Sequence, residues 1–183
     1  MRVLGLSGSL RRDSHNTRLL RGVGELLAPG AELVVFERLA EIPPFNEDAE
    51  HDPPEAVAEL KAAIASADAV LIATPEYNAS IPGALKNALD WVSRPFASTP
   101  LTRKPAAVIG ASTGLFGAVW AQAETRKVLA TIGAVVVDRE LPIGQADEAL
   151  AAHGLPRERD VAEALSATLD ELLELADRTR IAA

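Results

Sequence analysis

The segment 7–17 brings hydroxyl groups, an amide side chain and arginines together in one short stretch. It follows the apolar run 3–6 and precedes a pattern of helical spacing, so it lies where a strand ends and a helix begins. A helix start carries unpaired N–H groups and the positive end of the helix dipole, which favour an anion. Arginine adds charge-assisted hydrogen bonds, so the segment suits a phosphate monoester. Its donors are Ser9, Arg11, Arg12, Ser14, Asn16 and Thr17.

The same stretch matches neither of the common glycine-rich phosphate motifs. A P-loop would need a lysine after its glycines, and the dinucleotide fingerprint would need further glycines. On these residues alone an alternative stays open, in which Ser14 serves only as a helix cap and the arginines are solvated. Asp13 adds an opposing charge to the segment.

A second polar segment, 74–83, follows the apolar run 69–73. Ser80 is placed to cap the next helix, and Pro82 lies near its first turn, where a missing N–H costs nothing. The stiff turn before Ser80 is suited to present backbone groups to a flat heteroaromatic ring. The alternative is an ordinary strand-to-helix turn.

A third segment, 110–117, follows the run 106–109 and is rich in small residues. Small residues let the backbone approach a ligand closely. A flexible surface turn is the alternative interpretation of this segment.

Short apolar runs alternate with segments of helical period along the chain. The runs are nearly continuous in Val, Ile, Leu and Ala, as in strands that helices cover on both faces, which favours a parallel sheet. We expect strands at 3–6, 33–36, 69–73, 106–109 and 134–137. We expect helices at about 17–27, 57–64, 85–92, 119–132 and 161–176. Two stretches rich in turn residues, 42–54 and 139–156, are expected to be irregular.

These strand–helix units predict one domain, residues 1–183, of α/β class with a three-layer, doubly wound parallel sheet of five strands. The three ligand-suited segments follow the first, third and fourth strands. In the flavodoxin-like order 2-1-3-4-5, the first and third strands flank the switch point where ligands bind. We therefore expect this strand order, with the three segments meeting at one edge of the sheet.

Composition excludes several partners and chemistries. The chain has 18 Lys and Arg against 26 Asp and Glu, a net charge of −8, which disfavours nucleic acid and anionic membranes as partners. It contains no cysteine, so redox chemistry requires a cofactor. No stretch approaches the ~20 apolar residues of a membrane helix, and we expect a cytoplasmic protein. His15, His51 and His153 share no metal-ligand spacing, so no metal site is expected.

Two motifs resemble those of the NADPH-dependent FMN reductase family, which includes bacterial quinone, chromate and azo-dye reductases. The first is Gly8-Ser9-Leu10-Arg11 with Ser14 and Asn16. The second, which is long and specific, is Pro75-Glu76-Tyr77-Asn78 with Ser80, Pro82-Gly83, Leu85-Lys86-Asn87 and Asp90-Trp91. The strand–helix plan agrees with the family along roughly the whole chain.

The resemblance implies that FMN is the bound cofactor and that NADPH or NADH is the co-substrate. The flavin N5 then carries the hydride, no side chain has a catalytic role, and electrons pass to a quinone, azo, chromate or flavin acceptor. The first segment would hold the FMN phosphate, and the other two would surround the isoalloxazine ring, largely through main-chain atoms in the second segment. The expected cofactor-binding residues are Ser9, Arg11, Ser14, His15, Asn16, Thr17, Pro75, Glu76, Tyr77, Asn78, Ser112, Thr113 and Gly114.

The resemblance also implies a homodimer or homotetramer with the flavin near the subunit boundary. Phe116 and Trp120 are candidates for that boundary, whereas Trp91 is better suited to the core. Two residues depart from the family pattern. Asp13 adds a carboxylate to the phosphate segment, which lowers FMN affinity unless Arg12 offsets it, and Ala118 stands where many members have a second glycine.

Two other functions share the expected fold. A flavodoxin-type electron carrier binds FMN without oxidising nicotinamide, but its ring is usually clamped by aromatic residues, which form only 4% of this chain. A phospho-acceptor receiver domain carries an acidic pair after the first strand, where this chain has Ser7, Gly8 and Ser9. The reductase remains the favoured interpretation.

Overall fold

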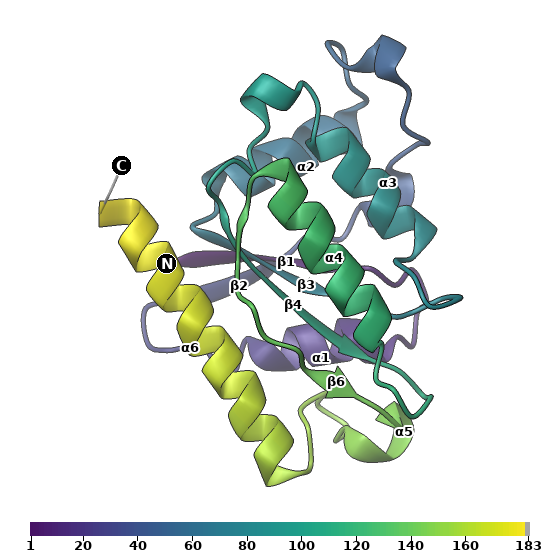
Figure 1. Cartoon of the computed structure of the whole chain (residues 1–183), viewed down its shortest axis with the longest axis vertical. Helices are drawn as coiled ribbons and strands as arrows, with labels where there is room; N and C mark the ends of the chain where they lie inside the picture. Colours follow the sequence, from purple (N-terminus) through teal and green to yellow (C-terminus); the bar gives the residue numbers. More distant parts are fainter. Residues whose placement is uncertain (182–183) are drawn as a thin grey trace.

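Six parallel strands form the central sheet of the computed structural model, which describes residues 1–181 (Figure 1). Five of them run in the order β2-β1-β3-β4-β5, and β6 pairs with the end of β4. The predicted order is therefore confirmed. The strands are β1 (Arg2–Ser7), β2 (Glu32–Val35), β3 (Ala69–Ala73), β4 (Pro105–Ala111), β5 (Val135–Val136) and β6 (Pro142–Ile143).

Helices cover both faces of this sheet (Figure 1). They are α1 (His15–Val23), α2 (Glu55–Ser66), α3 (Gly83–Val92), α4 (Val119–Ile132), α5 (Ala146–Ala149) and α6 (Arg159–Ile181). None of the helices formed by residues 1–181 has the length and apolar character that crossing a membrane requires.

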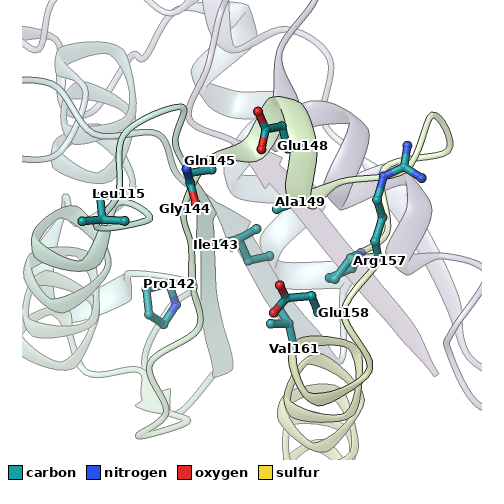
Figure 2. A pocket seen from close by; sticks show the side chains of 11 residues that line it. Leu115, Pro142, Ile143, Gly144, Gln145, Glu148, Ala149, Arg157, Glu158 and Val161 are labelled. Atoms are coloured by element: carbon teal, nitrogen blue, oxygen red, sulfur yellow. The ribbon is translucent and has the colours of Figure 1, made fainter.

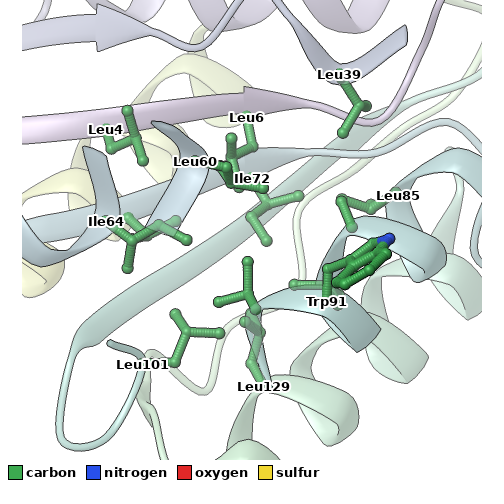
Figure 3. Close-up of a cluster of buried hydrophobic side chains, with 14 of the residues drawn as sticks. Leu4, Leu6, Leu39, Leu60, Ile64, Ile72, Leu85, Trp91, Leu101 and Leu129 are labelled. Carbon is green, nitrogen blue, oxygen red and sulfur yellow. The ribbon is translucent and has the colours of Figure 1, made fainter. Parts of the chain in front are cut away.

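Strand β3 is apolar at every position because both of its faces are buried. Val70 and Ile72 face the core shared with α2, α3 and α4 (Figure 3), whereas Leu71 faces the core shared with α1 and α6. Alternate side chains of a strand point to opposite faces, so a strand covered on both sides needs apolar residues at every position. Trp91 is 1% exposed in the first core, as its sequence context predicted.

The structure differs from the predicted elements at their ends and in one strand. Helix α1 ends at Val23 and not near Leu27, because Gly24 caps it and short turns follow. The irregular stretch 139–156 contains β6 and α5, so the sheet has six strands and not five. The stretch 42–54 forms only short 3-10 turns, at Leu39–Glu41 on its border and at Glu47–Ala49.

The proline-rich stretch 42–54 is fixed by helix α3. Asn87 accepts a hydrogen bond from the Phe45 N–H at 2.7 Å and donates to the Pro43 carbonyl at 2.8 Å. The Trp91 indole donates to the same carbonyl at 2.8 Å, and its ring meets that of Phe45 edge-on. Asn87 and Trp91 lie four residues apart and share one helix face, so this part of the second motif has a structural role.

Candidate functional site

The segments after β1, β3 and β4 meet at one edge of the sheet and enclose a cavity of about 90 Å³, which we call the strand-end cavity. Its lining residues are Ser9, Arg11, Ser14, His15, Asn16, Pro75, Glu76, Tyr77, Ala111, Ser112 and Thr113. Three residues expected at the site, Thr17, Asn78 and Gly114, lie outside this lining, and Ala111 was not expected. The carboxyl ends of parallel strands at a switch point are the usual ligand position in such sheets.

Helix α1 presents its first turn to the strand-end cavity. Ser14 is the N-cap residue, and its side chain accepts a hydrogen bond from the Thr17 N–H at 3.2 Å. The N–H groups of the first helical residues, His15 and Asn16, have no acceptor inside a helix. Ser14 can therefore cap the helix and also bind an anion, because its hydroxyl accepts from Thr17 and still has its own proton to donate.

The two arginines of the first segment differ in position. Arg11 lines the strand-end cavity, whereas Arg12 and Asp13 do not. All three are exposed, and neither arginine forms an ion pair with another residue in the range 1–181. The Arg11 guanidinium is thus available to an anion in the cavity, with five donors and no competing carboxylate partner.

The side chain of Asn16 pairs with the backbone of β4. Its amide donates to the Ala111 carbonyl at 2.8 Å and accepts from the Ala111 N–H at 2.9 Å. Asn16 is 3% exposed. One N–H of this amide joins α1 to β4, so the predicted donation from Asn16 to a phosphate depends on the second N–H of the same group.

Thr17 is also engaged elsewhere, which explains its absence from the cavity lining. Its hydroxyl lies 2.7 Å from that of Ser7 at the end of β1. This contact fixes the start of α1 against the strand that precedes it. Thr17 thus supports the first segment and does not face the cavity.

His15 connects the first segment to α5. The Arg18 guanidinium donates to His15 Nδ1 at 2.8 Å, and a guanidinium has no acceptor. Nδ1 therefore accepts in this contact, and Nε2 lies 3.0 Å from an Asp147 carboxylate oxygen. Both ring nitrogens have partners, so only the backbone of His15 is available to a ligand.

The second segment forms a tight turn. Tyr77 and Ser80 exchange two backbone hydrogen bonds of 3.1 and 3.3 Å. Both central residues have positive φ, 54° at Asn78 and 58° at Ala79, which is the pattern of a type I′ turn. Asn is favoured in this conformation, and Ala is not.

Two carboxylates join this turn to helix α4. Glu76 accepts a hydrogen bond from the Ala121 N–H at 3.0 Å, and Glu124 accepts from Ser80 Oγ at 2.6 Å and from the Ile81 N–H at 3.2 Å. The hydrogen bonds from Ser80 and Ile81 hold the pKa of Glu124 below its usual value.

The prediction that Ser80 caps the next helix is wrong, because α3 begins at Gly83 and Pro82 occupies the cap position.

The third segment is fixed by β6. The Ser112 N–H donates to the Ile143 carbonyl at 3.0 Å, and the Ser112 carbonyl accepts from the Ala146 N–H at 3.0 Å. Gly117 has φ of 57°, and a Cβ there would lie 2.4 Å from the Ile143 nitrogen. Ala118 has φ of 60° and is the residue that precedes α4. Ala118 therefore adopts the left-handed backbone conformation that glycine favours, although it is not a glycine.

Large apolar side chains lie exposed at the protein surface on the segments that form the strand-end cavity. They come from all three segments and from the start of α4, and their rings and branches are about half exposed or more. The residues are Leu10, Tyr77, Leu115, Phe116 and Trp120, which we call the apolar rim. The Phe116 and Trp120 rings lie 5.0 Å apart.

A second cavity, of about 380 Å³, has Leu115 in its lining (Figure 2). It is bordered by β6, α5 and the start of α6, with the Glu148 and Glu158 carboxylates in its lining. It shares no lining residue with the strand-end cavity. Within residues 1–181, no three His, Asp or Glu side chains are grouped as metal ligands.

Two residues were not predicted: Ala111, which lines the strand-end cavity, and Glu124, which is hydrogen-bonded to the second segment from outside it. Glu124 lies in the middle of an amphipathic helix, where a glutamate is ordinarily solvated, and no local pattern marks it. Ala111 lies at the end of an apolar run, and its small size next to Ser112 was the one available signal.

Comparison with known proteins supports the geometry. The model of the family described as NADPH-dependent FMN reductase matches residues 1–148. The chain is 37% identical over 172 residues to 2-hydroxy-1,4-benzoquinone reductase from Burkholderia sp, covering 93% of both proteins. It is 43% identical over 157 residues to an NAD(P)H-dependent FMN reductase from Pseudomonas aeruginosa, covering 84% of this chain and 83% of that protein.

A solved structure agrees over nearly the full length. The flavoenzyme FerB, an NAD(P)H:(acceptor) oxidoreductase from Paracoccus denitrificans, has a TM-score of 0.84 and 37% identity to the chain, with 97% of both chains covered. The similarity therefore extends into α6, which lies outside the match to the family model.

Proposed function

This chain belongs to the NADPH-dependent FMN reductase family, and from that premise we propose that its strand-end cavity holds the phosphate end of FMN. One observation carries the proposal: the segments after β1, β3 and β4 meet around a cavity at the switch point of the sheet. When bound, FMN supplies the redox chemistry, accepting a hydride from NAD(P)H and giving electrons to an acceptor. The chain is an oxidoreductase that uses FMN with NAD(P)H as electron donor.

The donor set around the cavity fits a phosphate. We assign the phosphate oxygens to the hydroxyls of Ser9 and Ser14, the Arg11 guanidinium, and the backbone N–H groups of His15 and Asn16. None of these groups carries negative charge, although the chain as a whole has a net charge of −8. A dianion is thus bound by local donors in an acidic protein.

The isoalloxazine ring is assigned to the gap between the second and third segments. The backbone of Pro75, Glu76 and Tyr77 would face one side, and Ser112 and Thr113 the other. Because the Glu76 side chain is used by Ala121, its main chain is the part available to the ring. Asn78 and Gly114 then act through the shape of their turns.

The apolar rim supports a flat, apolar acceptor such as a quinone. Tyr77 lines the strand-end cavity and is 51% exposed, and an exposed aromatic ring at a site favours aromatic ligands. A Burkholderia relative with 37% identity is named for reduction of a benzoquinone. We therefore place a quinone ahead of azo dye, chromate and free flavin as the acceptor.

The apolar rim also supports assembly of the chain into a homodimer or homotetramer. Leu115, Phe116 and Trp120 are about half exposed or more, the Phe116 and Trp120 rings lie together, and exposed apolar patches mark interaction sites. A second copy seated on this patch would cover part of it and leave the site at the subunit boundary. We propose a cytoplasmic location, which the use of NAD(P)H as donor supports.

Anaerobic mixing tests the proposal directly. The purified protein loaded with FMN is mixed with NADPH or NADH, and loss of the yellow flavin absorption is followed. Bleaching within seconds, followed by recolouring on addition of a quinone, is expected. A flavin that stays yellow would indicate an electron carrier of flavodoxin type, and a protein with no gain in thermal stability on adding FMN would contradict the site itself.

A further inference from the structure

The turn assigned to the isoalloxazine ring is held from outside by helix α4. Glu124 reaches from the second turn of α4 to Ser80 and Ile81, and Glu76 reaches from the start of the turn to the Ala121 N–H. The contacts lie at the two ends of the segment 76–81. The turn and the helix start are therefore joined at two points.

The turn and the start of α4 both depend on these hydrogen bonds. Ala79 has φ of 58°, a left-handed conformation that costs an alanine free energy, so surrounding contacts must maintain it. Helix α4 begins after Ala118 without any side-chain cap of its own, and Ala121 is fully buried. A buried N–H without an acceptor is costly, and Glu76 provides that acceptor.

The two carboxylates differ in what they determine. Glu76 lies in the second segment and accepts a hydrogen bond from an N–H of the helix, whereas Glu124 lies on the helix and accepts hydrogen bonds from the second segment. One Glu124 oxygen accepts from both Ser80 Oγ and the Ile81 N–H, at 2.6 and 3.2 Å. These contacts set the position of the turn backbone relative to the third segment, because α4 directly continues that segment.

We propose that Glu124 is a positioning residue of the flavin site: it holds the 76–81 turn so that the backbone of the turn faces the isoalloxazine ring. The inference rests on the proposed function, since it concerns the turn assigned to that ring. Glu124 does not line the strand-end cavity and acts through Ser80 and Ile81.

The hydrogen bonds between Glu124 and the second segment can be removed or kept by different substitutions. Glu124→Ala removes the acceptor for both donors. Glu124→Gln keeps a carbonyl oxygen at the same reach, so it preserves both hydrogen bonds without the charge. Ser80→Ala removes one of the two bonds from the other side. Glu163→Ala is the matched control, because Glu163 is an exposed glutamate on α6 whose partner is Arg159, one helical turn away.

The experiment titrates FMN into each apoprotein and follows quenching of flavin fluorescence, with the midpoint potential of the bound flavin and thermal unfolding of the apoprotein as further readouts. We expect Glu124→Ala to raise the Kd for FMN about tenfold and to shift the potential. Glu124→Gln should restore both to near the wild-type values, and Glu163→Ala should change neither.

The double variant gives an independent check. Glu124 and Ser80 share one contact, so the loss in Glu124→Ala with Ser80→Ala should be smaller than the product of the two single losses. If Glu124→Ala fails to fold, Ser80→Ala alone must weaken FMN binding and shift the potential.

Three outcomes would overturn the inference. Wild-type affinity and potential in Glu124→Ala would exclude a positioning role, and so would a lower melting temperature of the apoprotein with an unchanged potential. A Glu124→Gln variant as weak as Glu124→Ala would show that charge matters and not the hydrogen bonds. Failure of the wild type to bind FMN would instead remove the proposed function, and the inference with it.

Discussion

The side-chain amide of Asn16 pairs with the backbone of Ala111 through two hydrogen bonds, of 2.8 and 2.9 Å, across 95 positions of sequence. Asn16 lies in the first turn of α1, and Ala111 is the last residue of β4. The pair therefore fixes the first segment relative to the third. Both residues line the strand-end cavity, so the contact joins two sides of it.

Asn16→Ala is expected to destabilise the apoprotein as well as weaken FMN binding. It leaves the buried N–H and C=O of Ala111 without partners, which costs about 2 kcal/mol or more and lowers the Tm by about 5 °C or more. Thermal unfolding without ligand measures this effect. An unchanged Tm would show that the Asn16 amide is not structural, and Arg11→Ala, which removes no internal hydrogen bond of its side chain, is the matched control.

Arg11→Ala is expected to weaken FMN binding more than Arg12→Ala. Arg11 lines the strand-end cavity and Arg12 does not. Loss of a charge-assisted hydrogen bond to phosphate corresponds to about tenfold or more in Kd, whereas loss of a distant, screened charge should stay within about threefold. FMN titrations at two salt concentrations measure both values. Equal dissociation constants for the two variants would contradict the assignment of Arg11.

The main strands could be predicted because each is a continuous apolar run between turn residues. Helices on both faces require that pattern, and β3 at Ala69–Ala73 was predicted with its observed ends. Strand β6 could not be predicted, because two residues give no periodicity and its pairing depends on the end of β4. Local patterns predict elements, and short edge strands depend on tertiary contacts.

Residue type and position predicted which segments meet at the strand ends, but not the hydrogen-bond partners of two of their side chains. Ser80 precedes a helix, and a cap was the natural local interpretation, yet its partner Glu124 lies 44 positions away. Asn16 likewise bonds to Ala111, which lies 95 positions away. A polar side chain can find its hydrogen-bond partner nearby in the sequence or across the fold, and sequence spacing does not distinguish the two cases.

Ala79→Gly is expected to stabilise the protein. Ala79 is exposed and has φ of 58°, so its methyl group gains little packing while the backbone remains in a disfavoured region. Glycine at this position of a type I′ turn should add about 0.5–1 kcal/mol, or about 2–4 °C in Tm. Thermal unfolding of the apoprotein tests this, and a lower Tm would show that the turn adopts another conformation.

Gly117→Ala is expected to destabilise the third segment, and Gly114→Ala to be tolerated. A Cβ at Gly117 would lie 2.4 Å from the Ile143 nitrogen and 2.5 Å from the Pro142 carbonyl carbon, and the backbone has positive φ. At Gly114 the same Cβ would meet only the Ser112 hydroxyl, at 3.4 Å. We expect a cost of about 2 kcal/mol or more for Gly117→Ala, from strain at the displaced strand β6. Similar unfolding midpoints for both variants in urea would contradict the close approach of β6.

Glu124 should contribute stability that depends on pH. Its pKa is held below the usual value of 4.5 by the hydrogen bonds from Ser80 and Ile81, so the folded state binds the proton less tightly than the unfolded state does. The contribution is therefore fully present above that usual value and is lost as the pH falls through the lowered, folded-state pKa. Because Glu124 is exposed, its size should be below about 1 kcal/mol. We expect the Tm difference between wild type and Glu124→Gln to be positive at pH 7 and to shrink toward zero at pH 3, whereas a difference that stays constant across this range would show that the carboxylate does not titrate in contact with the turn.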